Sequence, residues 1–266
     1  LTSQTRGVAS ATMPPATPRW LTKAVGGNDM ASTPRRRWAW VLLLVIASLV
    51  IVGVYRKAVP QEGSTAYGQA AEALGDLPVK GRAPMTGYSL DQFGPAWSDN
   101  SDPALTHPWG HNGCGTRDDA LARDLVGAKL KSGSRCRIVS GELHDPYTGR
   151  TIQWRRGRNT SAVVQIDHVV ALGNAWVTGA QQLPMDRRQA LANDPLNLLA
   201  VEGQANQNKG AGDAATWLPP HKSYRCDYVS RQIAVKRKYH LWVTSAERNA
   251  MIRVLSTCPN HALPAR

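Results

Sequence analysis

An uncharged run of 18 residues, Trp38–Tyr55, divides the chain into two parts that must fold in different surroundings. As a helix it would span roughly 27 Å at about 1.5 Å per residue, close to the thickness of a bilayer core. Three arginines, Arg35–Arg37, stand directly before it, so we expect the N-terminus to stay inside and the C-terminal bulk to lie outside. We favour a single-pass membrane anchor. A cleaved signal peptide is the main alternative, although no clear small-residue cleavage site follows, and a buried soluble helix is a third.

The remaining sequence predicts one folded domain flanked by less ordered segments. Residues 1–37 are rich in Pro, Thr, Ser and Ala without an apolar period, which predicts a disordered cytoplasmic tail. Met30 offers an alternative start of the protein. We expect a linker at 56–86, in which Gln69–Leu74 is a candidate short helix, a folded domain at 87–258 that is long enough to bury a core, and a tail at 259–266.

Positive charge is unevenly distributed along the chain. The formal net charge is +13; residues 1–57 carry eight bases and one acid, whereas residues 58–266 carry 24 bases and 18 acids. The exported part therefore keeps only a moderate positive excess. This excess suits a polyanionic partner, but an ordinary soluble surface explains it equally well.

Four cysteines, Cys114, Cys136, Cys226 and Cys258, all follow the apolar run. An even number on the exported side predicts two disulfides, and we expect neighbours to pair, Cys114 with Cys136 and Cys226 with Cys258. A zinc site made of all four is the alternative. We disfavour it because the sequence holds no C-x-x-C pair.

Helices and a hairpin are predicted on either side of the central region. Thr116–Asp119 has the form of a capping box before a helical stripe, and a second one, Thr244–Glu247, begins the last helix. Residues 136–142 and 150–155 form two strands joined by a turn at 145–149. The bases that follow, Arg155, Arg156 and Arg158, surround Trp154 and are candidates for nucleic-acid binding, with a solvated turn equally plausible. The helix predicted at 226–241 carries three consecutive bases, which we expect to face water, with a DNA contact as the second interpretation: Lys236, Arg237 and Lys238.

The central stretch 163–210 carries the chemistry. Asp167 and His168 end an apolar run, Asn197 opens a second one, and Asn206 follows nine residues later, with Lys209 beyond it. We expect two strands, 163–166 and 196–201, and a helix over 202–208, with the end of the first strand left open between 169 and 172. A neutral His can accept a proton from water, and Asp and Asn oxygens suit a hard cation. An Asp-His pair alone is a weak signal, but the ordered set is stronger.

This set and its surroundings resemble a known family. The motifs GCGTRDDALARDL, DPYTGRTI, IDHVVALGNAW and NDPLNLLAVEGQANQNKG resemble the HNH endonucleases, also called the His-Me finger or ββα-metal superfamily. Within it, the chain is similar to the secreted bacterial branch related to the C-terminal HNH domain of GmrSD-type restriction enzymes. The resemblance implies that His168 is the general base, that Asp167 and Asn206 are metal ligands, that Asn197 fixes the loop that presents the histidine, and that Lys209 contacts phosphate.

The expected fold is therefore α+β: a ββα-metal (HNH) core with flanking helices and a β-hairpin, preceded by one transmembrane or signal helix. The expected function is an extracytoplasmic, metal-dependent endonuclease that hydrolyses DNA, or RNA, with one divalent ion, Mg²⁺ or Mn²⁺, and no small-molecule cofactor. It would be either membrane-anchored through 38–55 or secreted. The alternative is a non-catalytic, disulfide-stapled module that binds nucleic acid or an envelope partner. Substrate preference, biological role and oligomeric state stay open.

Overall fold

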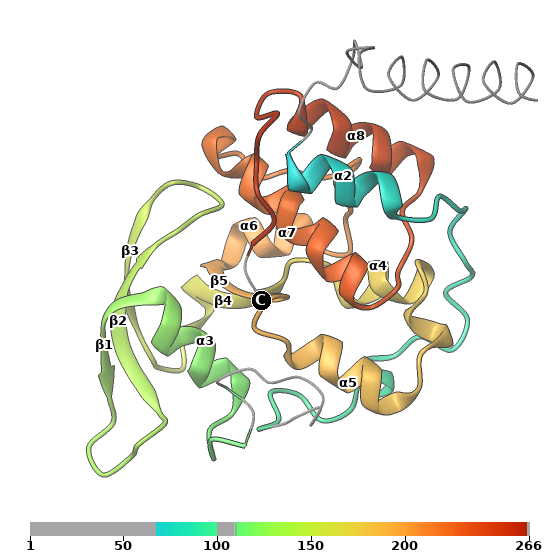
Figure 1. Ribbon diagram of the computed structural model, residues 1–266. Coiled ribbons are helices and arrows are strands. Elements are labelled where there is room, and N and C mark those ends of the chain that lie inside the picture. Colours follow the sequence, from blue (N-terminus) through green and yellow to red (C-terminus); the bar gives the residue numbers. More distant parts are fainter. Residues whose placement is uncertain (1–67, 100–108, 110, 265–266) are drawn as a thin grey trace, which may run out of the picture. The chain divides into compact units, whose positions relative to one another are not determined.

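The computed structural model describes residues 68–99, 109 and 111–264, all within one compact unit, Gly63–Arg266. The predicted tail and the apolar run Trp38–Tyr55 lie outside the described residues. Among the residues described, no helix is both long enough and apolar enough to cross a membrane. The fold is a mixed α+β arrangement with two small antiparallel sheets, as expected in outline (Figure 1).

Three helices, one from the start and two from the end of the described chain, pack together. They are α2 (Gln69–Asp76), α7 (Arg225–Lys238) and α8 (Ser245–Leu255), and Figure 1 shows α2 beside α8 although most of the chain separates them. Ala70, Ala73 and Leu74 of α2 enter the same hydrophobic cluster as residues of α7 and α8. Part of the predicted linker is thus built into the core, because α2 is a short amphipathic helix whose apolar face needs cover.

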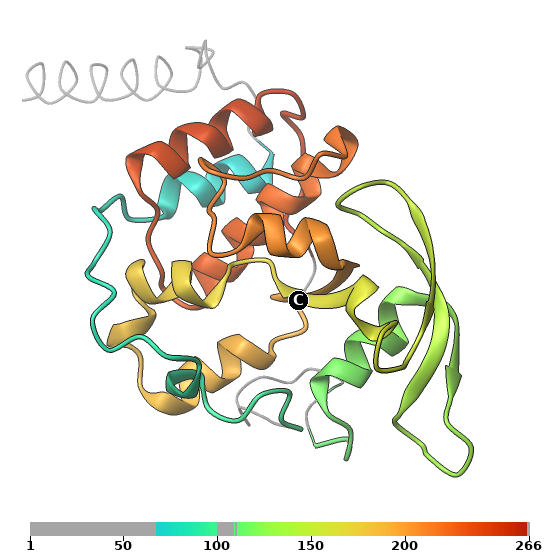
Figure 2. The ribbon, with the colours of Figure 1, turned by 180° about the vertical axis from the view of Figure 1, so that it is seen from behind.

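The first sheet has the order β1-β2-β3 and stands at one side of the molecule (Figures 1 and 2). Its strands are β1 (Leu125–Leu130), β2 (Ile138–His144) and β3 (Thr151–Arg155), preceded by α3 (Thr116–Asp124). The predicted hairpin is β2–β3. The apolar spacing of Ala120, Leu121, Leu125 and Val126 predicts a helix through Val126, but α3 ends at Asp124. Leu125 and Val126 instead begin β1, which pairs with β2 from Leu125↔Leu143 onward. Strand pairing, which the local pattern does not contain, decides this boundary.

The second sheet has two antiparallel strands, β4 (Val164–His168) and β5 (Leu198–Glu202), paired from Val164↔Glu202 to His168↔Leu198. α6 (Gly203–Lys209) follows β5 directly and packs on both strands. The chain between the strands forms α4 (Leu172–Val177), a 3-10 turn η3 (Ala180–Gln182) and α5 (Met185–Asn193), and α5 contacts η1 (Leu90–Phe93). Two further 3-10 turns complete the fold: η2 (Ser161–Val163) before β4, and η4 (Lys222–Tyr224) before α7.

Both disulfides pair as predicted. Cys114–Cys136 joins the loop before α3 to the segment that precedes β2, and Cys226–Cys258 joins the first turn of α7 to the residues after α8. In the chain-entropy view, each loop closure stabilises the fold by roughly 3 kcal/mol. The second capping box is confirmed, since Thr244 Oγ1 accepts a hydrogen bond from the Glu247 N–H. The first is wrong: Gly115 is the cap residue of α3, and the buried Thr116 hydroxyl donates instead to Asn193 Oδ1.

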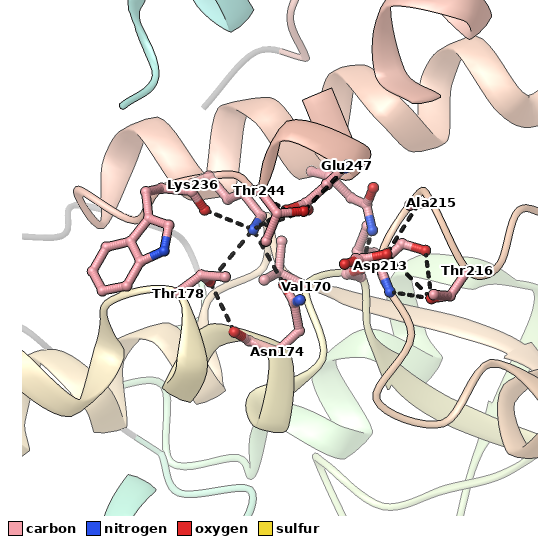
Figure 3. Close-up of polar contacts among 12 residues, drawn as sticks. Val170, Asn174, Thr178, Asp213, Ala215, Thr216, Lys236, Thr244 and Glu247 are labelled. Carbon is pink, nitrogen blue, oxygen red and sulfur yellow. Dashed lines mark hydrogen bonds and ion pairs between the residues drawn. The ribbon is translucent and has the colours of Figure 1, made fainter. Parts of the chain in front are cut away.

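One base that was expected to face water is fully buried. Lys236 of α7 lies with its Nζ 2.9 Å from Glu247 Oε1 and 3.0 Å from the carbonyl oxygen of Trp242. The same ammonium donates to Asn174 of α4 and to Thr178, as Figure 3 shows. Burial lowers the pKa of the Lys236 ammonium and raises the pKa of the Glu247 carboxyl, while the opposite charge of each partner counters both shifts. The pair thus fastens α4, α7 and α8 to one another.

We expect Lys236→Met to lower the free energy of unfolding by about 3–5 kcal/mol, because Glu247 would remain buried without its cation. Urea denaturation of the oxidised protein measures this. Arg237→Ala, one residue away with an exposed side chain, is the matched control and should change the value by no more than about 0.5 kcal/mol. Equal stabilities for the two variants would contradict the role assigned to Lys236.

Candidate functional site

The central polar residues meet at the end of β4, where the strand presents two neighbouring side chains to different partners. Asp167 pairs with Leu199 and His168 with Leu198 in the two-stranded sheet. Adjacent residues on a strand point to opposite faces. Asp167 accordingly contacts Lys209 of α6, and His168 contacts the carbonyl of Ala192 at the end of α5.

Asp167 is buried, with 5 % of its surface exposed, and both its oxygens are bonded. Its Oδ1 accepts a hydrogen bond from Lys209 Nζ at 2.9 Å, and its Oδ2 accepts one from the Tyr147 hydroxyl at 2.5 Å. Burial raises the pKa of the Tyr147 hydroxyl well above its usual range, and the negative charge of Asp167 adds to this. Tyr147 therefore stays protonated and donates its hydrogen to the carboxylate.

Lys209 makes a second bond, from Nζ to the backbone oxygen of His168 at 2.8 Å. Its side chain is completely buried. The ammonium therefore ties α6 to the end of β4 from within. These contacts suit a positioning role for Lys209 better than the direct phosphate contact that the resemblance implies.

A backbone carbonyl determines which nitrogen of the His168 ring carries the hydrogen. Its Nε2 lies 2.8 Å from the carbonyl oxygen of Ala192, and a carbonyl can only accept, so Nε2 carries the hydrogen and Nδ1 keeps a lone pair. Burial lowers the pKa of the imidazole, against the opposing effects of the Ala192 carbonyl and the Asp167 charge. The ring is thus neutral near pH 7, as a general base must be.

Trp97 covers the same histidine. The two rings stack with centroids 5.8 Å apart and planes 13° from parallel. Trp97 adopts a positive φ of 56°, which is unusual for a residue with a side chain. Gly115 permits this arrangement, because a Cβ there would lie 2.8 Å from the Trp97 carbonyl oxygen. Packing around Trp97 therefore holds an aromatic ring against His168.

Asn197 lies fully buried just before β5 and joins the two ends of the inserted helices. Its Oδ1 accepts from the Val170 N–H at 2.8 Å, and its Nδ2 donates to the carbonyls of Val170 and Leu191 at 3.3 and 3.2 Å. Its own carbonyl accepts from the Val169 N–H. These contacts suit a residue that fixes the chain immediately after His168.

Asn206 stands on α6, three residues before Lys209, so both lie on one side of the helix. Its Nδ2 donates to Gln165 Oε1 at 3.0 Å. Gln165 and Asp167 share a face of β4 because they are two residues apart. Asn206 therefore lies on the same side of the sheet as Asp167, and its amide nitrogen makes the bond to Gln165.

The oxygens of Asp167 and Asn206 fit a hard cation such as Mg²⁺, which keeps most of its waters and needs only one or two protein ligands. Each carboxylate oxygen of Asp167 has a second lone pair beyond its present hydrogen bond. Within the described ranges, no cluster of three or more His, Cys, Asp or Glu side chains could hold a metal ion.

The three candidate arginines do not join this site. Arg155 is exposed on β3. Arg156 donates from Nε to the Ile138 carbonyl at 2.6 Å, pairs with Asp118, and lies over the ring of Trp154, which is buried and offers no stacking platform. Arg158 lines a cleft on the first sheet.

Sequence reasoning missed Tyr147, Trp97, Gln165 and the carbonyl of Ala192. Tyr147 was placed in a turn between two strands, yet it is fully buried. A large aromatic residue in an otherwise polar turn was the available signal. Trp97 and Ala192 lie 71 residues before and 24 residues after His168, and no local pattern connects them with it.

We expect Asn197→Ala to destabilise the protein by about 2–3 kcal/mol, because the Val170 N–H and C=O would lose buried partners. Thermal or urea unfolding measures this. Asn208→Ala is the matched control, since Asn208 is exposed and bonds only to Gln204 among the described residues; its effect should stay within about 0.5 kcal/mol. A similarly small effect at Asn197 would refute the bracing role.

Comparisons with known proteins identify the family of the chain. The family described as "GmrSD restriction endonucleases, C-terminal domain" matches residues 115–254. A protein of Arthroderma benhamiae named "Uncharacterized secreted protein" is 37 % identical over 218 residues, which cover 81 % of this chain and 98 % of the relative. No solved structure matches the chain. The family match spans more than half of the sequence and includes every residue of the β4–β5–α6 unit, so the chain belongs to the GmrSD restriction endonuclease C-terminal domain family.

Proposed function

We propose that this protein is a metal-dependent endonuclease of the HNH type that hydrolyses DNA outside the cytoplasm. In this proposal β4, β5 and α6 form the ββα-metal core, with His168 as the general base. The observation that carries the proposal is the contact of His168 with the Ala192 carbonyl: Nε2 lies 2.8 Å from that oxygen, which leaves Nδ1 to accept a proton, and burial lowers the pKa of the ring. Two disulfides and a relative named as secreted support an oxidising location.

Three residues act around the attacking water in the proposed reaction: His168, Ala192 and Trp97. His168 Nδ1 accepts a proton from the attacking water as the new oxygen–phosphorus bond forms and the bond from phosphorus to the 3′-oxygen breaks. The products are a 5′-phosphate and a 3′-oxygen that takes up a proton from solvent. The Ala192 carbonyl holds the other nitrogen and stabilises the imidazolium that results. Trp97 keeps the ring in place and limits its exposure to bulk water.

Asp167 and Asn206 would hold the divalent ion, with Tyr147 and Lys209 orienting the carboxylate. A bound Mg²⁺ or Mn²⁺ supplies neutralisation of the charge that develops on the phosphoryl and leaving oxygens. Lys209 also holds the backbone oxygen of His168, so one ammonium positions both the carboxylate and the strand end that carries the base. The moderate basic excess of residues 58–266 suits a polyanionic substrate.

A non-catalytic binding module on the same scaffold is the second candidate. It is favoured by one observation: the charge of Asp167 is already neutralised by a buried ammonium. Under this alternative Lys209 serves the stability of the scaffold alone. The two candidates differ in whether the protein turns over substrate.

We expect His168→Ala to lower the rate of plasmid nicking by at least about 100-fold, because a positioned general base contributes roughly 10²–10⁴. The purified, oxidised full chain is assayed with Mg²⁺. His144→Ala is the matched control, since His144 is an exposed histidine on β2 and should leave the rate unchanged. Nicking by His168→Ala at the wild-type rate would rule out the assignment.

We also expect chelation by EDTA to abolish nicking by the wild-type protein, and an excess of Mg²⁺ or Mn²⁺ to restore it. Asp167→Asn should need a higher metal concentration for half-maximal activity, because it removes the charge that would attract the ion. Full activity in EDTA would contradict the metal requirement. An absence of nicking with either ion would favour the binding module.

A further inference from the structure

A basic cleft lies on the first sheet, away from the polar residues at the end of β4. Its volume is about 500 Å³, and its lining includes four bases: Lys131, Arg137, Arg156 and Arg158. None of its lining residues, all of which belong to the described part of the chain, is acidic. Asp118 offsets the charge of Arg156, and the other three bases form a concentration of positive charge that attracts an anion.

The fold itself brings these bases together. The end of β1, the start of β2 and the end of β3 lie side by side at the same end of the sheet. The Lys131 N–H donates to the Arg137 carbonyl there, and the Arg156 N–H donates to the Val139 carbonyl. Backbone pairing therefore forces Lys131, Arg137 and Arg156 to be neighbours. The Cys114–Cys136 disulfide holds the residue before Arg137 in place.

One of the four bases is held in place by contacts with the protein, and the other three are exposed to solvent. Arg156 is held by the Ile138 carbonyl, Asp118 and the Trp154 ring. Lys131, Arg137 and Arg158 are exposed, and no acid in the described ranges pairs with them. A pre-positioned guanidinium beside three exposed cations forms an anion-binding surface, and guanidinium groups match phosphate geometry well.

The cleft is connected to the proposed reaction centre by a single strand. Ser161, which lines the cleft, belongs to η2, and η2 leads directly into β4, whose last residue is His168. The five residues of β4 cover about 16 Å at 3.3 Å each. Along one strand of a duplex this distance corresponds to roughly five phosphates.

We infer that this cleft binds the phosphodiester backbone of the substrate nucleic acid several nucleotides from the bond that is cleaved. The inference rests on the proposed function, since it assumes that the substrate is cleaved at His168. The cleft contributes affinity and register, whereas the chemistry stays at the end of β4. Phosphate contacts of this kind position a nucleic acid without reading its sequence.

The test measures DNA binding separately from cleavage. The full chain carrying His168→Ala binds a fluorescent 20-base-pair duplex, and anisotropy is recorded between about 50 and 200 mM salt. Adding Lys131→Gln, Arg137→Gln and Arg158→Gln should weaken binding at least about 10-fold at the lower salt concentration. The slope of log K against log salt should fall by about 2–3, because up to three phosphate contacts are lost.

Two further variants make the result specific. Arg82→Gln, Lys222→Gln and Arg253→Gln together remove the same charge from exposed positions outside the cleft and should change affinity by less than about threefold. Lys131→Arg, Arg137→Lys and Arg158→Lys keep the charge and should retain binding. Equal losses in the cleft and control triple variants would overturn the inference, as would an absence of DNA binding by the parent chain.

Cleavage then distinguishes this inference from the proposed function. With His168 intact, the three Gln substitutions in the cleft should raise KM at least about 10-fold and leave kcat within about twofold. If the wild-type protein shows no nicking but its DNA binding still depends on the cleft, the endonuclease proposal fails while the binding site stands. A loss of kcat with unchanged KM would overturn the cleft as a binding site.

Discussion

The site depends on one buried ionic contact, that between Lys209 and Asp167. A carboxylate with 5 % exposure would be strongly destabilising alone. The ammonium at 2.9 Å and the Tyr147 hydroxyl at 2.5 Å offset this cost. Because the three residues come from α6, β4 and the β2–β3 turn, satisfying one charge requires that all three elements dock. The ionic contact thus sets the position of the last two residues of β4, including the histidine that follows.

The helices inserted between β4 and β5 control the other side of that histidine. Asn197 holds the Leu191 carbonyl, and the neighbouring Ala192 carbonyl holds the His168 ring. Arg123 and Arg231 both donate to the carbonyls of Pro195 and Leu198, which fixes the chain that leads into β5. A shift of α5 would therefore be transmitted to the imidazole. The insert therefore helps to orient the His168 ring in addition to the short strand pair.

The local sequence pattern was sufficient to predict those parts of the fold that contacts between residues close in sequence determine. The β2–β3 hairpin, the two final helices and both disulfides follow from turns, periodicity or cysteine position. The roles assigned to the residues from Asp167 to Lys209 rest on the family resemblance and stay predictions. Long-range contacts decide the rest. Lys236 was placed in water because three consecutive bases usually face it, but Glu247 and the Trp242 carbonyl receive it in the core. Leu125 joins β1 because β2 is available to pair with it. The stacking of Trp97 on His168 has no local signal at all.

The start and end of the described chain are hydrogen-bonded to each other. The Gly68 N–H donates to the Pro259 carbonyl at 2.7 Å, and the Ala70 N–H donates to the His261 carbonyl. α2 buries its apolar face against α7 and α8, so the first of the described helices cannot dock until the last of them has been synthesised. Contacts this distant in sequence are slow to form. Folding of the domain is therefore completed only after the whole chain has emerged, and a protein truncated near its end would leave α2 exposed as a target for proteases.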